Sequence, residues 1–267
     1  MMSETSTMSL LPTLKERYEE VRRRIDAAAR RSERDPGDIM LVAVTKFADP
    51  EDIRQLIELG HADFGENRVQ NLSKRVASIE EFLDRHRTMT SSRPVSMPER
   101  IRWHMIGHLQ RNKVSKVIDL VSLVHSVDTL RLAEELQDAA MKRDLTIDIL
   151  LQVNTSSEKS KYGIAPVAAP HLAELIDTMI HLRLRGLMTM APLTSDESRV
   201  RSCFTRCREL FDEMKKSGVG GPDFNILSMG MTNDFETAIE CGANIVRVGT
   251  AIFGEKAAED DSDAATG

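Results

Sequence analysis

Residues 41–47 read Leu-Val-Ala-Val-Thr-Lys-Phe, four apolar side chains followed by a threonine and then a lysine. A short apolar run of this kind predicts a strand buried in a parallel sheet. Lys46 then stands where the strand meets its loop. An unpaired lysine is costly to bury, so a lysine at this place must reach solvent, find a partner or take part in chemistry. Desolvation makes a lysine amine better at forming imines, and the simpler alternative is a side chain that extends to water.

Predicted strands and helices alternate along the chain on both sides of this run. The strands are expected at residues 41–47, 62–65, 101–107, 120–127, 146–153, 182–190, 224–229 and 244–248. The helices are expected at residues 12–34, 50–59, 68–83, 110–118, 129–143, 167–180, 196–216 and 233–241. Eight strands in strict alternation with helices predict an α/β protein with a TIM (β/α)8-type barrel. The chain begins with a helix and shows none after the last strand, so the first helix is expected to cover the gap.

The expected organisation is a single domain with polar extensions. Residues 1–11 are polar and read as a flexible N-terminus, and residues 12–254 form the barrel. Residues 84–100 hold two prolines and three serines and few apolar side chains, which predicts a surface insertion. Residues 255–267 are acidic and alanine-rich, which predicts a disordered tail.

Composition excludes several classes of protein. The 267 residues are 41% apolar, enough for a sizeable core, and the net charge of −6 argues against a nucleic-acid binder. The three cysteines form no CxxC motif, so neither a disulfide framework nor a metal site is expected. The chain shows no secretory signal and no membrane-spanning run, so we expect a soluble cytoplasmic protein, and a monomer.

In a barrel, the C-terminal ends of the strands share one face, and active sites lie there. Lys46 is the only lysine among the predicted strand ends. The loops after strands seven and eight read Ser228-Met229-Gly230-Met231-Thr232 and Arg247-Val248-Gly249-Thr250. Barrels often bind phosphate in these two loops, because glycine lets backbone amides approach an anion and hydroxyls add donors. The sequence therefore predicts a phosphate site, although the same glycines also suit tight turns.

An imine-forming lysine and a phosphate site on one face indicate a ligand that carries both an aldehyde or ketone and a phosphate. Pyridoxal phosphate has both groups. The sugar phosphates handled by Schiff-base aldolases have them as well, and the residues alone do not separate the two.

Six motifs, taken together and in order, resemble the pyridoxal phosphate homeostasis proteins, which are related to the N-terminal barrel of alanine racemase. The motifs are LVAVTKF, DFGENRVQ, WHMIGHLQRNK, LLQVNTSSEKSKYGI, RGLMTMAP and LSMGMTNDFETAIECGANIVRVGTAIFG, and the resemblance runs from about residue 12 to 254. It implies an alanine racemase-like barrel that binds pyridoxal 5′-phosphate and takes part in its intracellular homeostasis.

The resemblance also implies roles for particular residues. Lys46 would form the internal aldimine with the cofactor, and Asn67 would lie beside it. Arg247 would face the pyridine nitrogen, where a permanent cation keeps that nitrogen unprotonated and weakens the ring as an electron sink. The phosphate is assigned to the set Ser228, Gly249 and Thr250, with Gly230 and Met231 alongside.

Two functions follow from the resemblance. The first is a carrier that holds, buffers or delivers the cofactor, with amino acids or the apo forms of pyridoxal phosphate enzymes as further candidate partners. The second is an amino-acid racemase. Racemases complete their site with a second domain and a tyrosine from a partner subunit. This sequence ends after strand eight and offers only Tyr18 and Tyr162, so we expect a carrier without efficient catalysis. Lys161, beside Tyr162, is either an anion ligand or a solvated side chain.

Overall fold

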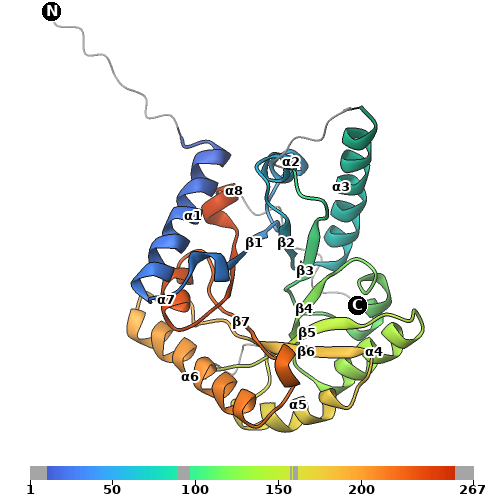
Figure 1. The fold of residues 1–267 in the computed structure, drawn as a ribbon, viewed down its shortest axis with the longest axis vertical. Coiled ribbons are helices and arrows are strands. Elements are labelled where there is room, and N and C mark those ends of the chain that lie inside the picture. The colour runs from blue at the N-terminus through green and yellow to red at the C-terminus, as the bar shows by residue number, and fades with distance from the viewer. Residues whose placement is uncertain (1–10, 90–96, 157, 159–161, 256–267) are drawn as a thin grey trace, which may run out of the picture.

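The computed structural model describes residues 11–89, 97–156, 158 and 162–255. Eight parallel strands close into a barrel in chain order, with β8 paired to β1, and helices surround them (Figure 1). The strands are β1 Met40–Val44, β2 Asp63–Glu66, β3 Arg102–Met105, β4 Leu123–Val127, β5 Ile147–Gln152, β6 Leu182–Met188, β7 Ile226–Ser228 and β8 Ile245–Val248. The predicted α/β barrel is thereby confirmed.

The helices alternate with the strands as expected, with one difference in kind. The α-helices are α1 Leu14–Arg31, α2 Pro50–Glu58, α3 Val69–Met89, α4 Leu130–Met141, α5 Ala169–Asp177, α6 Glu197–Lys216, α7 Phe235–Glu240 and α8 Thr250–Phe253. In the described part of the chain, 3₁₀ turns accompany them at η1 Pro36–Asp38, η2 Arg111–Lys116, η3 Pro166–Ala168 and η4 Gly221–Asp223. The helix expected at residues 110–118 is the 3₁₀ turn η2.

Helix α1 covers the barrel beside the last strand. Thr13 caps it through a capping box with Glu16, and the buried side chains of Val21 and Ile25 face the core. The helix packs against α7 and α8 (Figure 1). The expectation that nothing helical follows the last strand is wrong, because α8 Thr250–Phe253 forms one turn there.

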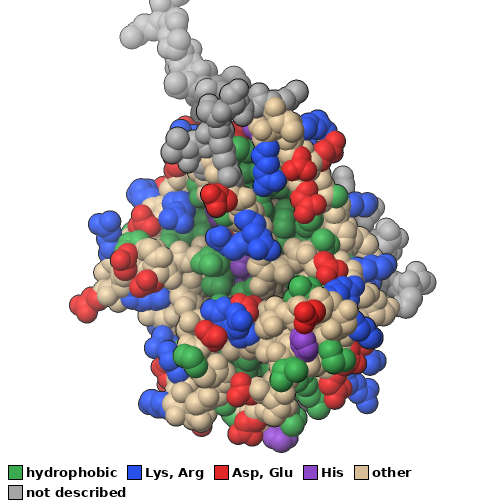
Figure 2. Space-filling model, turned by 45° about the vertical axis from the view of Figure 1, so that its right-hand side comes forward, with side chains coloured by type: hydrophobic (Ala, Val, Ile, Leu, Met, Phe, Trp, Pro, Cys, Tyr) green, Lys and Arg blue, Asp and Glu red, His purple; other side chains and the backbone are tan. Residues whose placement is uncertain are grey.

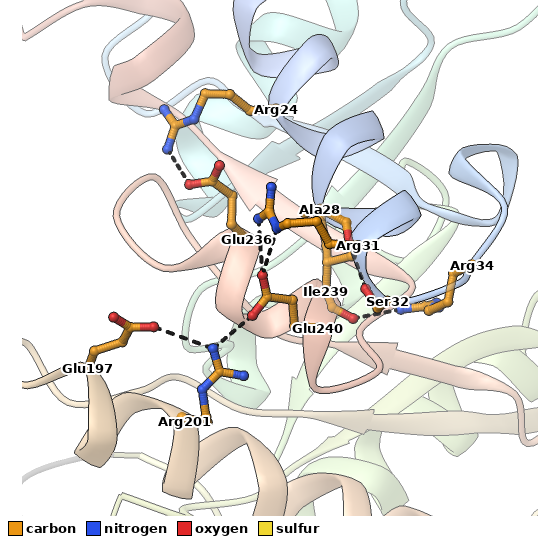
Figure 3. Close-up of polar contacts among 10 residues, drawn as sticks. All are labelled: Arg24, Ala28, Arg31, Ser32, Arg34, Glu197, Arg201, Glu236, Ile239 and Glu240. Atoms are coloured by element: carbon orange, nitrogen blue, oxygen red, sulfur yellow. Dashed lines mark hydrogen bonds and ion pairs between the residues drawn. The ribbon is translucent and has the colours of Figure 1, made fainter.

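Ion pairs join α1 to α7, the helix that precedes the last strand (Figure 3). Arg24 pairs with Glu236 at 2.8 Å, and Arg31 pairs with Glu240 at 3.0 Å. Arg201 of α6 reaches the other oxygen of Glu240 at 2.7 Å. Each pair is partly exposed and contributes modestly alone, but the shared Glu240 joins α1, α6 and α7 in one network.

Helix α3 extends further than the sequence indicated. The insertion was expected to begin at residue 84, whereas α3 continues to Met89. The extra turns carry charged pairs at helical spacing, Asp84 with Arg87 at 3.1 Å and Glu81 with Arg85. Such pairs support a solvated helix without apolar residues. Residues 90–96 lie outside the described residues, and Met97 is buried against the core.

The interior of the barrel is partly apolar and partly polar. Successive side chains of a strand point to opposite faces, so Leu123 and His125 share one face of β4, and Ile245 and Arg247 share one face of β8. Five buried apolar side chains fill one layer: Val42, Leu123, Leu150, Met188 and Ile245. Above and beside them lie buried His104, His125, Ser228 and Arg247. Among the described residues, no helix is long and apolar enough to cross a bilayer.

Candidate functional site

A cavity of about 1360 Å³ opens at the C-terminal ends of the strands. Its walls are the loops after several strands together with the ends of α1, α6 and α7. Of the predicted site residues it brings together Lys46, Asn67, Met231, Arg247, Gly249 and Thr250. Ser228 and Gly230 do not line it.

Lys46 lies in the loop that follows β1. The strand ends at Val44, so the lysine stands two residues beyond it rather than at its last residue. Its Nζ lies 4.6 Å from the ring centroid of Phe47. Within the described part of the chain, Lys46 makes no hydrogen bond or ion pair. The cavity therefore contains an amine that forms no ion pair with any described carboxylate.

A buried ion pair fixes the loop that carries Lys46. Glu66, the last residue of β2, is fully buried, and its Oε2 accepts from Arg75 Nη1 of α3 at 2.6 Å and from Thr45 Oγ1 at 2.9 Å. Arg75 also donates to the carbonyls of Thr45 and Ala48, on either side of Lys46. One guanidinium thus ties α3 to both ends of a four-residue segment around the amine.

The same glutamate holds the next loop. Glu66 Oε1 accepts from the backbone N–H of Asn67 at 2.8 Å, which places Asn67 at the cavity wall. Gly107, after β3, packs against that backbone so closely that a Cβ at this position would lie 2.3 Å from the Asn67 carbonyl oxygen. Only glycine fits this approach. The loops after β1, β2 and β3 are therefore held as one unit.

Arg247 reaches the cavity from inside the barrel. Its side chain is buried, Nη1 donates to Ser228 Oγ at 2.6 Å and Nη2 donates to the carbonyl of Thr189 at 3.0 Å. Burial lowers the pKa of Arg247 to about 10, and the charge of Asp234 opposes that shift, so the guanidinium stays a cation at neutral pH. The predicted role of Arg247 is compatible with this place.

Ser228 is placed differently from the expectation. Its hydroxyl lies inside the barrel, between Arg247 and Nδ1 of His125 at 3.0 Å, and it is fully buried. The hydroxyl thus binds protein groups and does not face the cavity. The strand ends at Ser228, and the inward direction of the last strand residue explains the difference.

A pair of hydroxyls occupies the place expected for a phosphate. Thr250 Oγ1 donates to Thr232 Oγ1 at 3.1 Å, and both threonines line the cavity together with Gly249. Gly230 shapes the first of the two loops: its φ is 91°, and a Cβ there would lie 2.7 Å from Ala238 Cβ. The Asp234 carboxylate accepts the N–H of Met231 at 2.5 Å and keeps that loop closed.

Two rings stack at the rim of the cavity. His108, after β3, lies on Tyr162 with ring centroids 4.5 Å apart and an angle of 18° between the planes. Tyr162 is 59% exposed, so it lies at the rim and not at the floor. Lys161, beside it in sequence, lies outside the described residues. On the face shown in Figure 2, basic and acidic side chains are interspersed.

These groups together suit an anionic ligand that carries a carbonyl. The Lys46 amine can attack a carbonyl carbon, while the buried Arg247 cation and the threonine hydroxyls can bind an anion or a ring nitrogen.

No sequence motif drew attention to Thr232 or Arg75. Thr232 was only one residue of a glycine-containing loop, but an arginine in the apolar stripe of Leu72 and Val76 was a usable signal for Arg75.

Comparisons with known proteins agree with this geometry. The family of the alanine racemase N-terminal domain matches residues 17–257. The pyridoxal phosphate homeostasis protein of Aquifex aeolicus is 36% identical over 245 residues, which cover 90% of this chain and 97% of the relative. The protein of that name from Pseudomonas aeruginosa is 35% identical over 246 residues, covering 92% of this chain and 97% of the relative.

Solved structures give the same result. The crystal structure of an unknown protein from Bifidobacterium adolescentis is 39% identical, with a TM-score of 0.81 over 90% of this chain and 94% of that one. PipY of Synechococcus elongatus, in a structure with PLP bound, is 29% identical, with a TM-score of 0.73 over 91% of this chain and 100% of PipY. Alanine racemase of Clostridium difficile, at 13% identity and a TM-score of 0.64 over 90% of this chain and 57% of the racemase, shares the fold.

Proposed function

The chain belongs to the family of the alanine racemase N-terminal domain and, with relatives at 36% and 35% identity, to the pyridoxal phosphate homeostasis proteins, and from this membership we propose that it binds pyridoxal 5′-phosphate through Lys46 and takes part in the homeostasis of that cofactor. The relatives' names and the PLP-bound PipY favour this cofactor over a sugar phosphate. The observation that carries the proposal is Lys46, an amine without a carboxylate partner among the described residues, in the same cavity as a buried arginine and two hydroxyls.

The residues of the cavity fit the aldehyde, the pyridine nitrogen and the phosphate of the cofactor. When bound, pyridoxal phosphate supplies an aldehyde that condenses with an amine, with loss of water, and a ring that withdraws electrons. Lys46 is the amine for the aldehyde, and the Arg75–Glu66 pair holds its loop in place. Arg247 is the cation for the pyridine nitrogen. The phosphate is assigned to Thr232, Thr250 and Gly249. Thr232 is proposed here in the role that the sequence analysis gave to Ser228.

We infer that the protein holds and releases the cofactor and is not an efficient catalyst. Arg247 keeps its charge at neutral pH, and a cation beside the pyridine nitrogen disfavours protonation of that nitrogen, which makes the ring a weaker electron sink. Tyr162 is the candidate for a second proton carrier, yet it is exposed and stacked on His108. The cavity is also larger than a cofactor alone needs, which leaves room for an amino acid or for the lysine of a recipient apo-enzyme.

Equilibrium dialysis of the purified chain against pyridoxal 5′-phosphate, pyridoxal and inorganic phosphate tests the proposal. The chain should retain the phosphorylated cofactor and bind pyridoxal at least tenfold more weakly, because each lost charge-assisted hydrogen bond costs roughly 1.5–3 kcal/mol. Mixing the loaded protein with the apo form of a pyridoxal phosphate enzyme should restore that enzyme's activity. A chain that retains no pyridoxal phosphate refutes the proposal, and a loaded chain that never releases it refutes the carrier role.

A further inference from the structure

A chain of hydrogen bonds runs through the interior of the barrel from its N-terminal end to the cavity. It begins at Asp63, the first residue of β2, and ends at Arg247 of β8. His104 Nε2 lies 3.3 Å from Asp63 Oδ1, and His104 Nδ1 lies 3.0 Å from His125 Nε2. His125 Nδ1 lies 3.0 Å from Ser228 Oγ, which accepts from Arg247 at 2.6 Å. All five side chains are at least nine-tenths buried.

The charge of Asp63 determines which atom donates and which accepts along this chain of hydrogen bonds. Burial raises the pKa of this carboxyl, but hydrogen bonds from His104 and Arg102 outweigh the effect and hold the pKa at about 2. An ionised carboxylate only accepts, so Nε2 of His104 carries the proton that faces Asp63. Arg102 binds Asp63 from the outer side at 2.5 and 2.6 Å, and its side chain is 46% exposed.

The remaining members then have one consistent arrangement. A neutral His104 accepts at Nδ1, so His125 donates from Nε2 and accepts at its own Nδ1 from the hydroxyl of Ser228. Burial, His104 and Arg247 lower the pKa of His125 well below its ordinary value, so the His125 ring is neutral. A second proton on His104 would exchange donor and acceptor in the next two hydrogen bonds, His104 to His125 and His125 to Ser228. Ser228 Oγ would then face two donors, and its own hydrogen would have no acceptor among these partners.

This arrangement has an unusual consequence for Arg247. A buried arginine commonly pairs with a carboxylate, which cancels its charge. Here its contacts are a hydroxyl and a carbonyl, and Asp63 lies at the far end of the hydrogen-bond chain, beyond Ser228 and two imidazole rings. The charge of the Asp234 carboxylate raises the pKa of Arg247 and partly offsets the effect of burial. Among the described residues, the guanidinium is thus held in place by neutral groups, with no carboxylate in contact.

We propose that Asp63, His104, His125 and Ser228 form a relay of positioning residues that orients Arg247 toward the cavity as a cation that no described carboxylate contacts. This deepens and rests on the proposed binding of pyridoxal phosphate, since Arg247 is the group assigned to the ring nitrogen. None of the four residues touches the cofactor, and they act through Arg247. Groups that fix a binding residue from behind commonly change affinity by about tenfold to a hundredfold when they are removed.

The first test uses the chain without cofactor. Long-range ¹⁵N–¹H NMR correlations on histidine-labelled protein at neutral pH give the protonation of each ring, and His104→Phe and His125→Phe identify the two signals. Both rings are expected to be neutral with the proton on Nε2. Ser228→Ala removes the donor to His125, so the Nδ1 resonance of His125 should move and that of His104 should move less. A proton on Nδ1 of either ring, or two protons on one ring, overturns the relay.

The second test measures affinity for pyridoxal 5′-phosphate. Ser228→Ala should weaken binding about tenfold and shift the absorbance of the bound cofactor, while Ser228→Thr, which keeps the hydroxyl, should restore both. His61→Phe is the matched control: His61 is buried and binds the Asp63 carbonyl at 2.7 Å but lies outside the relay. A folded Ser228→Ala chain with unchanged affinity and spectrum overturns the positioning role. If the unmodified chain binds no cofactor, the proposed function fails instead, and the NMR result still decides the relay.

Discussion

Replacing Arg75 with methionine should destabilise the protein far more than an ordinary surface substitution. Arg75 is the cation that pairs with fully buried Glu66, and removing one partner of a buried pair typically costs about 3–5 kcal/mol, because the other charge stays buried without compensation. Glu66 would keep three donors, Thr45 Oγ1, the N–H of Asn67 and the N–H of Arg68. We therefore expect a loss near the lower limit, about 3 kcal/mol.

Denaturant unfolding of matched variants measures this loss. Arg85→Met on the same helix is the control, since its pair with Glu81 is 66% and 65% exposed and should contribute less than about 1 kcal/mol. Adding Glu66→Gln to Arg75→Met removes the buried charge and should recover at least about 1 kcal/mol, which a double-mutant cycle would detect. A loss for Arg75→Met no larger than that for Arg85→Met would refute the argument that the buried pair fixes the Lys46 loop.

Three further predictions concern the phosphate site, pH and catalysis. Thr232→Val or Thr250→Val should weaken pyridoxal phosphate binding about tenfold in dialysis and leave pyridoxal binding unchanged, because only the phosphate loses a hydrogen bond; equal losses for both ligands would contradict the assignment. Burial lowers the pKa of His61 from 6.5 to about 4, so between these pH values the unfolded chain gains a proton that the folded chain lacks. The free energy of unfolding should therefore fall by about 3 kcal/mol as the pH drops through this window, and denaturation curves of His61→Phe should show a smaller fall. Exchange of the α-proton of L- and D-alanine in heavy water should stay negligible, since Tyr162 is exposed and stacked; rapid interconversion of the enantiomers would make it a second base.

The fold could be predicted from local patterns because each strand and helix follows from its own residues. The apolar run at residues 41–44 and the seven other predicted strands indicated the barrel. Pro50 and Gly60 marked the start and the end of α2. Element ends were less predictable. Residues 84–89 look polar enough for a loop, and only the pairing of Asp84 with Arg87 and of Glu81 with Arg85 shows why the helix continues.

Part of the site could be predicted as well, because loops after parallel strands converge on one face. Lys46, Arg247 and Thr250 were predicted there, and all three line the cavity. The direction of a side chain at a strand end could not be predicted from the sequence. Ser228 is the last residue of β7 and points into the barrel, whereas Thr232, four residues later, faces the cavity.

The interior relay was beyond sequence reasoning for a different reason. His104 lies in the strand predicted at residues 101–107 and His125 in the strand predicted at residues 120–127, and neither stretch indicates that the two rings meet. Their contact depends on the register between β3 and β4, in which His104 lies opposite Leu123. A histidine pair on neighbouring strands is only visible once that register is known.

The most direct test of the account is to identify the residue that bonds the cofactor. The purified chain is incubated with pyridoxal 5′-phosphate, reduced with borohydride, digested and analysed by mass spectrometry. The account predicts one major adduct, carrying the phosphorylated pyridoxyl group on Lys46, and no adduct in Lys46→Ala, which should remain folded. A main adduct on any other lysine, or none in the unmodified chain, would contradict it.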